Sequence, residues 1–194
     1  MILSNQGIKR ALDAGDLIID PLPEADQYTT SAVDFFVGSD FRCWDEKIFK
    51  VSGATVTLNL AEQKFQMTAA AYLRKMELEK DGTFLFPPYA KTGTHVLGIT
   101  RELVHLKMGS KLAARVEGRS SLARIGLVVH LTAPTIHAGF KGNITLEIIN
   151  HSPFWLKLEP NKTRLCQIIF EQLESDPSSE IKTDFQGQTS PSGR

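Results

Sequence analysis

The sequence is poor in cysteine. Only two cysteines, Cys43 and Cys166, occur among its 194 residues. They stand far apart and form no C-x-x-C pair, which argues against a thiolate zinc site. The same spacing argues against a disulfide framework. We therefore expect two reduced, half-buried thiols.

The chain also lacks an excess of charge of either sign. Lysine plus arginine and aspartate plus glutamate number 22 each, so no net basic field exists to hold a nucleic-acid backbone. The first twenty residues contain no continuous apolar run, so neither a signal peptide nor a membrane span is predicted. These absences favour a cytoplasmic protein that binds neither nucleic acid nor membrane.

What is present is an ordinary globular composition. Hydrophobic residues make up 42% of the chain and charged residues 23%, which is enough to bury one core. We expect a single domain over residues 1–174. Residues 175–194 are rich in Ser, Pro, Gly, Gln and charge, so this stretch is predicted to be a flexible tail.

The chain begins with a short helical pattern. Ser4 or Asn5 can cap this helix, and Gly15 can end it in a left-handed conformation. Its apolar face holds Ile8, Ala11 and Leu12. We expect this helix to pack on the rim of a sheet.

Many short strand-like runs follow the helix, separated by Gly and Pro turns. The spacing, without long helices between the runs, favours a mainly β fold with a distorted β-barrel or jelly-roll-like body and few short helices. Residues 62–80 fit either a helix or a structured insert or mobile loop. The predicted strands are residues 32–38, 54–60, 83–86, 95–100, 111–116, 143–150, 155–158 and 165–173.

A Gly-Arg-Ser-Ser turn is the first motif with chemical character. Gly118 permits a tight turn, and Arg119, Ser120 and Ser121 place a guanidinium and two hydroxyls at the start of a short helical run, residues 121–125. Free backbone N–H groups and the helix dipole at such a terminus favour an anion, and a triphosphate suits that geometry.

Arg124 follows Ser120 by four residues, so on a helical turn it faces the same side and could reach the ligand or a catalytic carboxylate. The motif by itself has a simpler interpretation, because Ser at a helix start is commonly only a cap.

A glutamate inside a strand pattern is the second motif. Glutamate is a poor strand former and is costly to bury, so Glu147 between two apolar residues needs a reason. Either this face is solvated, or Glu147 is a general acid/base poised by partial burial and by a nearby arginine. Alternation puts Ile144, Leu146 and Ile148 on one face and Thr145, Glu147 and Ile149 on the other.

The order of several motifs resembles the dCTP deaminase branch of the dUTPase-like trimeric nucleotide hydrolases. The amino-terminal helix and strand of that family are similar to MILSNQGIKRALDAGDLIIDP, and its S-V-D strand to SAVDFFVG. Its nucleotide and catalytic motifs are similar to GRSSLARIGL and TLEIIN. Its later glutamine-bearing strand and its tail are similar to RLCQIIFEQL and FQGQ. The ordered matches cover nearly the whole chain.

The resemblance implies a dUTPase-like (β-clip) homotrimer with active sites between the subunits. Each site would take a triphosphate that carries Mg²⁺, and the tail, residues 175–194, would close over the nucleotide. Whether dTTP acts as a feedback inhibitor is left open.

The resemblance also assigns roles to single residues. Glu147 would be the catalytic acid/base, while Ser120, Arg124 and the backbone carbonyl of Ala133 would hold the attacking water. The nucleotide would contact Arg119, Ser120, Ser121, Leu122, Ala123, Arg124, Thr145, Leu146, Glu147, Gln167 and Gln188.

Zinc is not expected as a cofactor. Many nucleobase deaminases activate water with zinc held by H-x-E and P-C-x-x-C ligands, whereas none of the five histidines here begins an H-x-E. A route without protein-bound metal is consistent, in which proximity and electrostatic preorganisation replace the Lewis acid. The histidines are interpreted as structural or surface groups, with His130 and His137 as possible pocket or inter-subunit contacts.

Two positions depart from the family pattern. His137 stands where dUTPases, and bifunctional enzymes that also release diphosphate, carry an aspartate that activates water against the α-phosphate. Asp184 stands before Phe-Gln-Gly-Gln, where many relatives have a basic residue. The first departure argues against dUTPase activity, and the second removes an expected cationic phosphate contact.

The sequence therefore predicts a dCTP deaminase that makes dUTP and ammonia from dCTP and water. One alternative is a dUTP diphosphatase or a bifunctional enzyme. A second alternative is a catalytically silent, nucleotide-binding regulatory trimer.

Overall fold

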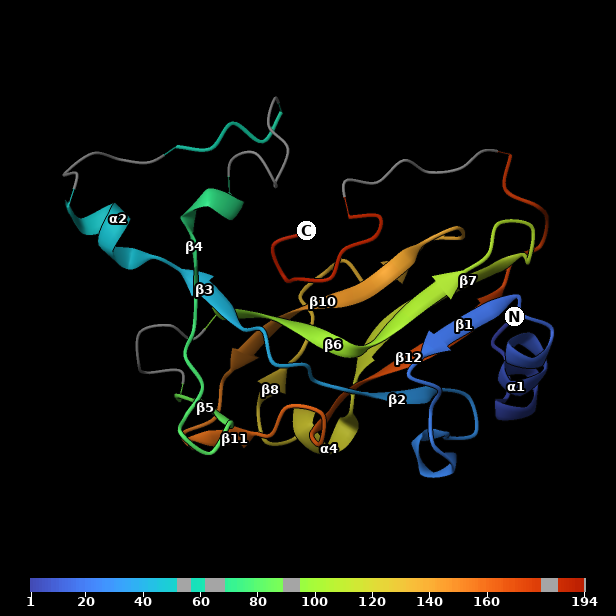
Figure 1. Ribbon diagram of the computed structural model, residues 1–194, viewed down its shortest axis with the longest axis horizontal. Coiled ribbons are helices and arrows are strands. Elements are labelled where there is room, and N and C mark those ends of the chain that lie inside the picture. The colour runs from blue at the N-terminus through green and yellow to red at the C-terminus, as the bar shows by residue number, and fades with distance from the viewer. Residues whose placement is uncertain (52–56, 62–68, 89–94, 179–184, 194) are drawn as a thin grey trace.

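The computed structural model of the chain describes residues 1–51, 57–61, 69–88, 95–178 and 185–193 (Figure 1). Strands dominate it and the helices are short, so the predicted mainly β fold is confirmed. The helices are α1 (Asn5–Asp13), α2 (Glu46–Val51) and α4 (Ser120–Ala123), with single 3₁₀ turns η1 (Ala25–Gln27) and η2 (Ala70–Tyr72).

The strands of the described residues form three antiparallel sheets. The largest has the order β4-β3-β6-β10-β8, with β1 also paired to β6; a second has the order β2-β12-β7-β9, and β11 pairs with β5. The bounds are β1 (Leu17–Asp20), β2 (Val33–Phe36), β3 (Arg42–Trp44), β4 (Leu73–Lys75), β5 (Phe84–Phe86), β6 (His95–Leu106), β7 (Leu112–Gly118), β8 (Leu127–Val128), β9 (Thr135–Ile136), β10 (Lys141–Asn150), β11 (Leu156–Leu158) and β12 (Arg164–Gln172).

One apolar core joins the sheets. Its largest side chains are phenylalanines, and the rings of Phe41 and Phe84 stack with their centroids 4.2 Å apart. Such pairs add stability beyond the area that they bury. The fully buried phenylalanines are Phe35, Phe41, Phe84, Phe86 and Phe170.

The first helix forms as the sequence predicts. The Ser4 hydroxyl accepts a hydrogen bond from the Gly7 amide at 3.3 Å, so Ser4 is the N-cap. Ile8 is fully buried. Gly15, just past the helix, has a φ of +71°, the left-handed conformation that glycine adopts at little cost.

Most predicted strands are present, but residues 54–60 are an exception. Residues 57–60 of that run are not a strand, and 54–56 lie outside the described residues. In the ambiguous stretch 62–80, residues 69–80 contain η2 and β4 rather than a long helix, while 62–68 lie outside the described residues. The predicted strand runs did not include β1, which only the family resemblance indicated. They also did not include β3, β4, β8 and β9, which have two or three residues each and so show no alternation.

A buried carboxylate connects β6 to β2. Glu102 has no exposed surface. Its carboxylate accepts hydrogen bonds from Gln27 Nε2 at 3.1 Å, Arg101 Nη2 at 2.7 Å and the Phe36 amide at 3.0 Å. Burial raises the pKa of Glu102, and Arg101 opposes that rise. These contacts hold β2, which carries Asp34, at a defined position beside β12.

Residues 185–193 of the tail lie along the first half of β10 (Figure 1). Gln188 donates from Nε2 to the Asn143 carbonyl at 2.7 Å, and its own carbonyl accepts from the Asn143 amide at 3.0 Å. The Gly187 amide donates to the Lys141 carbonyl at 2.6 Å. Residues 185–193 therefore cover the first half of β10.

Candidate functional site

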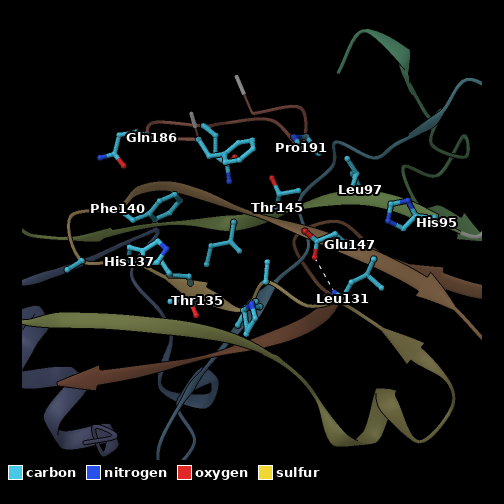
Figure 2. A pocket seen from close by; sticks show the side chains of 18 of the residues that line it. His95, Leu97, Leu131, Thr135, His137, Phe140, Thr145, Glu147, Gln186 and Pro191 are labelled. Atoms are coloured by element: carbon cyan, nitrogen blue, oxygen red, sulfur yellow. Dashed lines mark hydrogen bonds between the residues drawn. The ribbon is translucent and has the colours of Figure 1, made fainter. Parts of the chain in front are cut away.

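A cavity of about 660 Å³ lies between β10 and the tail (Figure 2). Strands β3, β6, β7 and β9 and the loop that follows β8 complete its walls. The lining residues are Trp44, His95, Leu97, Val116, Leu131, Ala133, Pro134, Thr135, Ile136, His137, Ala138, Phe140, Ile144, Thr145, Glu147, Phe185, Gln186, Gln188 and Pro191.

Glu147 points into this cavity from β10 (Figure 2). Ile144, Leu146 and Ile148 are buried, whereas Thr145, Glu147 and Ile149 are half-buried, so the two faces of the strand are as predicted. The Glu147 carboxylate accepts a hydrogen bond from the Leu131 amide at 3.3 Å. It is thus neither a core residue nor a freely solvated one, and it is held beside the loop that carries Ala133.

The cavity contains polar atoms that no described protein group satisfies. Within the described chain, Thr145 Oγ1, Gln188 Oε1 and His95 Nε2 are buried and have no hydrogen-bond partner. Buried polar groups are paired in the great majority of cases, since an unmade hydrogen bond costs about 1–3 kcal/mol. A ligand with a polar edge, such as a nucleobase, would supply these partners.

Two of the predicted site residues flank β9, Ala133 before it and His137 after it. Ala133 and His137 both line the cavity and both are exposed to solvent. The other histidine considered for the pocket, His130, does not line it. The His130 ring is half-buried, with Nε2 3.9 Å from the Glu117 carboxylate.

The Gly-Arg-Ser-Ser turn forms a separate site. Arg119 is the N-cap of α4 and makes no side-chain cap bond. Ser120 and Ser121 are the first helical residues and are exposed, as is Arg124. Hence the simpler interpretation, in which a serine caps this helix, does not hold, and both hydroxyls face solvent.

Arg119 is held in place by Asp34 and Arg164. Its Nη2 lies 3.3 Å from Asp34 Oδ2, and its Nη1 donates to the Arg164 carbonyl at 3.3 Å. Asp34 is 4% exposed. Burial raises the pKa of the Asp34 carboxyl, while Arg119 and then Arg164 lower it. The Arg119 guanidinium is therefore held in a defined position at the N-terminus of α4.

The two sites do not meet within one chain. No residue of 119–124 lines the cavity that holds Glu147, and Figure 1 shows α4 away from the tail. In the described part of the chain, no arginine forms an ion pair with Glu147. The nearby arginine that the sequence led us to expect is thus absent from this cavity.

Leu146 and Gln167 also lie outside the cavity, as does Leu122 of the turn described above. The Leu146 side chain is fully buried on the core face of β10, so only its backbone faces the site. Leu122 packs partly buried against the core. Gln167 is on β12, between Asp34 of β2 and Glu117 of β7 in the register of the sheet.

Several lining residues were not identified from the sequence. Trp44 and His95 come from β3 and the start of β6, and Phe140 precedes β10. Only the pairing of β6 with β10 puts His95 near Glu147. The sequence held one signal for the orientation of His95: the alternation of β6 places His95 and Leu97 on one face of the strand.

Among the described residues, no group of three or more His, Cys, Asp or Glu side chains is arranged to hold a metal ion. In the same residues, no helix has the length and apolar character needed to cross a membrane.

Comparisons with known proteins agree with the motifs. The model of the dCTP deaminase-like family matches residues 2–173. A dCTP deaminase, dUMP-forming, of Methanosphaera stadtmanae is 35% identical over 98% of this chain and 91% of its own length. A dCTP deaminase of Rhodospirillum rubrum is 37% identical over 92% of this chain and 86% of its own length.

A solved structure shares the fold. It is the 2'-deoxycytidine 5'-triphosphate deaminase of Agrobacterium tumefaciens, with a TM-score of 0.60 and 19% identity. The match covers 87% of this chain but 47% of that one, so this chain spans about half of the length of the Agrobacterium protein.

Proposed function

Because the chain belongs to the dCTP deaminase-like family, we propose that it catalyses the hydrolytic deamination of dCTP to dUTP and ammonia. The observation that carries the proposal is the position of Glu147, a half-buried acid that faces a cavity with several polar atoms that lack a partner among the described residues. Such a cavity suits a base whose edge both donates and accepts hydrogen bonds.

The chemistry needs one group that moves protons. Water adds to C4 of cytosine, its oxygen forming the new bond while the electron pair of the C4–N3 double bond moves to N3. Glu147 accepts the proton of this water and delivers it to N3. The remaining hydroxyl proton then passes to the amino nitrogen, the C4–N bond breaks, and ammonia leaves as the C4 carbonyl forms.

The backbone around Glu147 supports this role. The Leu131 amide fixes one carboxylate oxygen, and Ala133, two residues later, also lines the cavity. We propose that the Ala133 carbonyl holds the attacking water. Positioning of this kind lowers the barrier without any metal on the protein.

The rest of the site is proposed to come from a neighbouring subunit. The exposed Ser120, Ser121 and Arg124 lie outside the cavity of their own chain. In a homotrimer they would reach the nucleotide bound at the Glu147 cavity of the next subunit. Arg119, held by Asp34, would bind a phosphate there.

We propose that Mg²⁺ enters with the triphosphate. The donor groups of the described residues give the ion no protein cluster, so phosphate oxygens and water would be its ligands. The ion offsets phosphate charge when bound. Closure of the tail, the action of dTTP and the cytoplasmic location stay predictions.

A bifunctional enzyme is the second candidate. Several relatives, such as that of Methanosphaera stadtmanae, are named dUMP-forming, which favours it. His137 argues against it, because this exposed residue lines the cavity where an aspartate would be needed to activate a second water. A neutral imidazole is still able to act as a base. The identity of the product, dUTP or dUMP, therefore decides between the two candidates.

Product analysis tests both candidates. With dCTP and Mg²⁺ the protein is expected to release ammonia and accumulate dUTP, measured by anion-exchange separation of dUTP from dUMP. The His137→Asp variant, which restores a carboxylate, is expected to raise the dUMP share. If the wild-type protein converts dCTP to dUMP and diphosphate, the bifunctional assignment replaces ours. Binding of dCTP without any product would favour the alternative of a catalytically silent regulatory trimer.

Arg119→Ala is expected to weaken triphosphate binding by roughly 1 to 3 kcal/mol, because a charge-assisted hydrogen bond is lost. Calorimetry with dCTP in a Glu147→Gln background measures this without turnover. Arg115→Ala is the matched control, since Arg115 lies on the adjoining strand and pairs with Glu117 and Glu171. Equal affinities in the two variants would show that Arg119 has only a structural role.

A further inference from the structure

His95 has no role in the mechanism above, yet it lies in the cavity with Glu147 (Figure 2). It is the first residue of β6, and its ring is half-buried. None of the motifs that indicated the family includes it.

The pairing of β6 with β10 brings His95 beside Glu147. In the register, Leu97 is opposite Glu147 and His95 is opposite Ile149. Opposed residues of an antiparallel pair share a face, so His95 and Glu147 are diagonal neighbours, with Cα atoms roughly 7–8 Å apart and within reach of long side chains.

Both side chains have hydrogen-bonding capacity left. His95 Nε2 is buried and has no partner within the described chain. Among the described residues, Glu147 makes one hydrogen bond, to the Leu131 amide, although a carboxylate can accept several. The imidazole and the carboxylate can therefore each form a further hydrogen bond, with the other group or with a ligand.

Burial favours the neutral form of His95. Burial lowers the pKa of His95, and the Glu147 carboxylate opposes that shift. From β3, Trp44 brings no charge, and Arg42 is paired with Asp40 at 3.0 Å. Among the described residues, Glu147 is thus the charged group that affects the protonation of His95.

We propose that His95 is a positioning residue of the deaminase site. As a neutral imidazole it orients the Glu147 carboxylate and leaves it free to take the proton of water. As an imidazolium it pairs with Glu147, which weakens that carboxylate as a base and turns the site off. This inference rests on the proposed function and adds a pH-dependent partner to its catalytic acid.

Kinetics of two variants test the inference. His95→Phe should lower kcat for ammonia release about tenfold while KM changes little. His95→Asn keeps a neutral hydrogen-bonding group and should recover most of kcat. For the wild type, kcat/KM should rise as pH increases through the pKa of His95, because the neutral form is the working one. This acid limb should be lost in both variants.

His105→Phe is the matched control. His105 is on the same strand and its pKa is also lowered by burial and by Lys141 and Lys107, but it does not line the cavity. It should leave kcat, KM and the pH profile unchanged. A His95→Phe enzyme with the kcat and acid limb of the wild type would overturn the proposal.

A titration independent of turnover separates this inference from the proposed function. In histidine-labelled protein, the NMR midpoint of His95 should move to lower pH in Glu147→Gln, because the carboxylate that favours the imidazolium is gone. An unchanged midpoint would refute the coupling. If the wild type releases no ammonia from dCTP, the proposed function fails, while this titration still decides whether the pair is coupled.

Discussion

Glu147→Gln is expected to bind dCTP with nearly wild-type affinity and to release no measurable ammonia. The amide has the shape of the carboxylate and can keep the contact with Leu131 through its oxygen, but it cannot shuttle a proton. Loss of a general acid/base costs on the order of 10² to 10⁴ in rate. Calorimetry and a coupled ammonia assay on the same preparation measure both quantities.

The control for this prediction is the neighbouring Thr145→Val. It changes the same face of β10 and removes a hydroxyl that has no partner in the described chain, so it should weaken binding while leaving a measurable rate. Retention of kcat within about tenfold in Glu147→Gln, equal to roughly 1.4 kcal/mol of barrier, would remove Glu147 from the mechanism.

Mixing two inactive variants is expected to restore activity. Glu147→Gln chains keep Arg124, and Arg124→Ala chains keep Glu147. If each site takes Glu147 from one subunit and Arg124 from the next, every mixed trimer of the two chains would have both groups at about one of its three sites. Co-expression with two different affinity tags, followed by tandem purification, gives the mixed assemblies for the ammonia assay.

The geometry motivates this complementation, because α4 is exposed and lies outside the Glu147 cavity. Mixing Glu147→Gln with a Glu147→Gln, Arg124→Ala double variant is the control. No chain there supplies the acid, so activity should stay absent. Mixed assemblies that remain inactive would mean that Arg124 and Glu147 do not act across a subunit boundary.

Local patterns in the sequence determined much of the fold. The apolar alternation of residues 143–150 predicted β10 and both of its faces, and Ser4 and Gly15 predicted the ends of α1. These signals depend on neighbours along the chain, and so they can be read without knowing the tertiary structure. Motif order likewise indicated the family before any geometry was known.

Tertiary structure decided what surrounds the acid. Whether Glu147 is solvated or lines a cavity depends on the loop that carries Leu131 and on the tail, both distant along the chain. His95 and Trp44 join the site only through strand pairing, which no local pattern encodes. Arg124, predicted near the acid, lies elsewhere in the monomer, because helical spacing sets the face of a side chain and not the cavity that it meets.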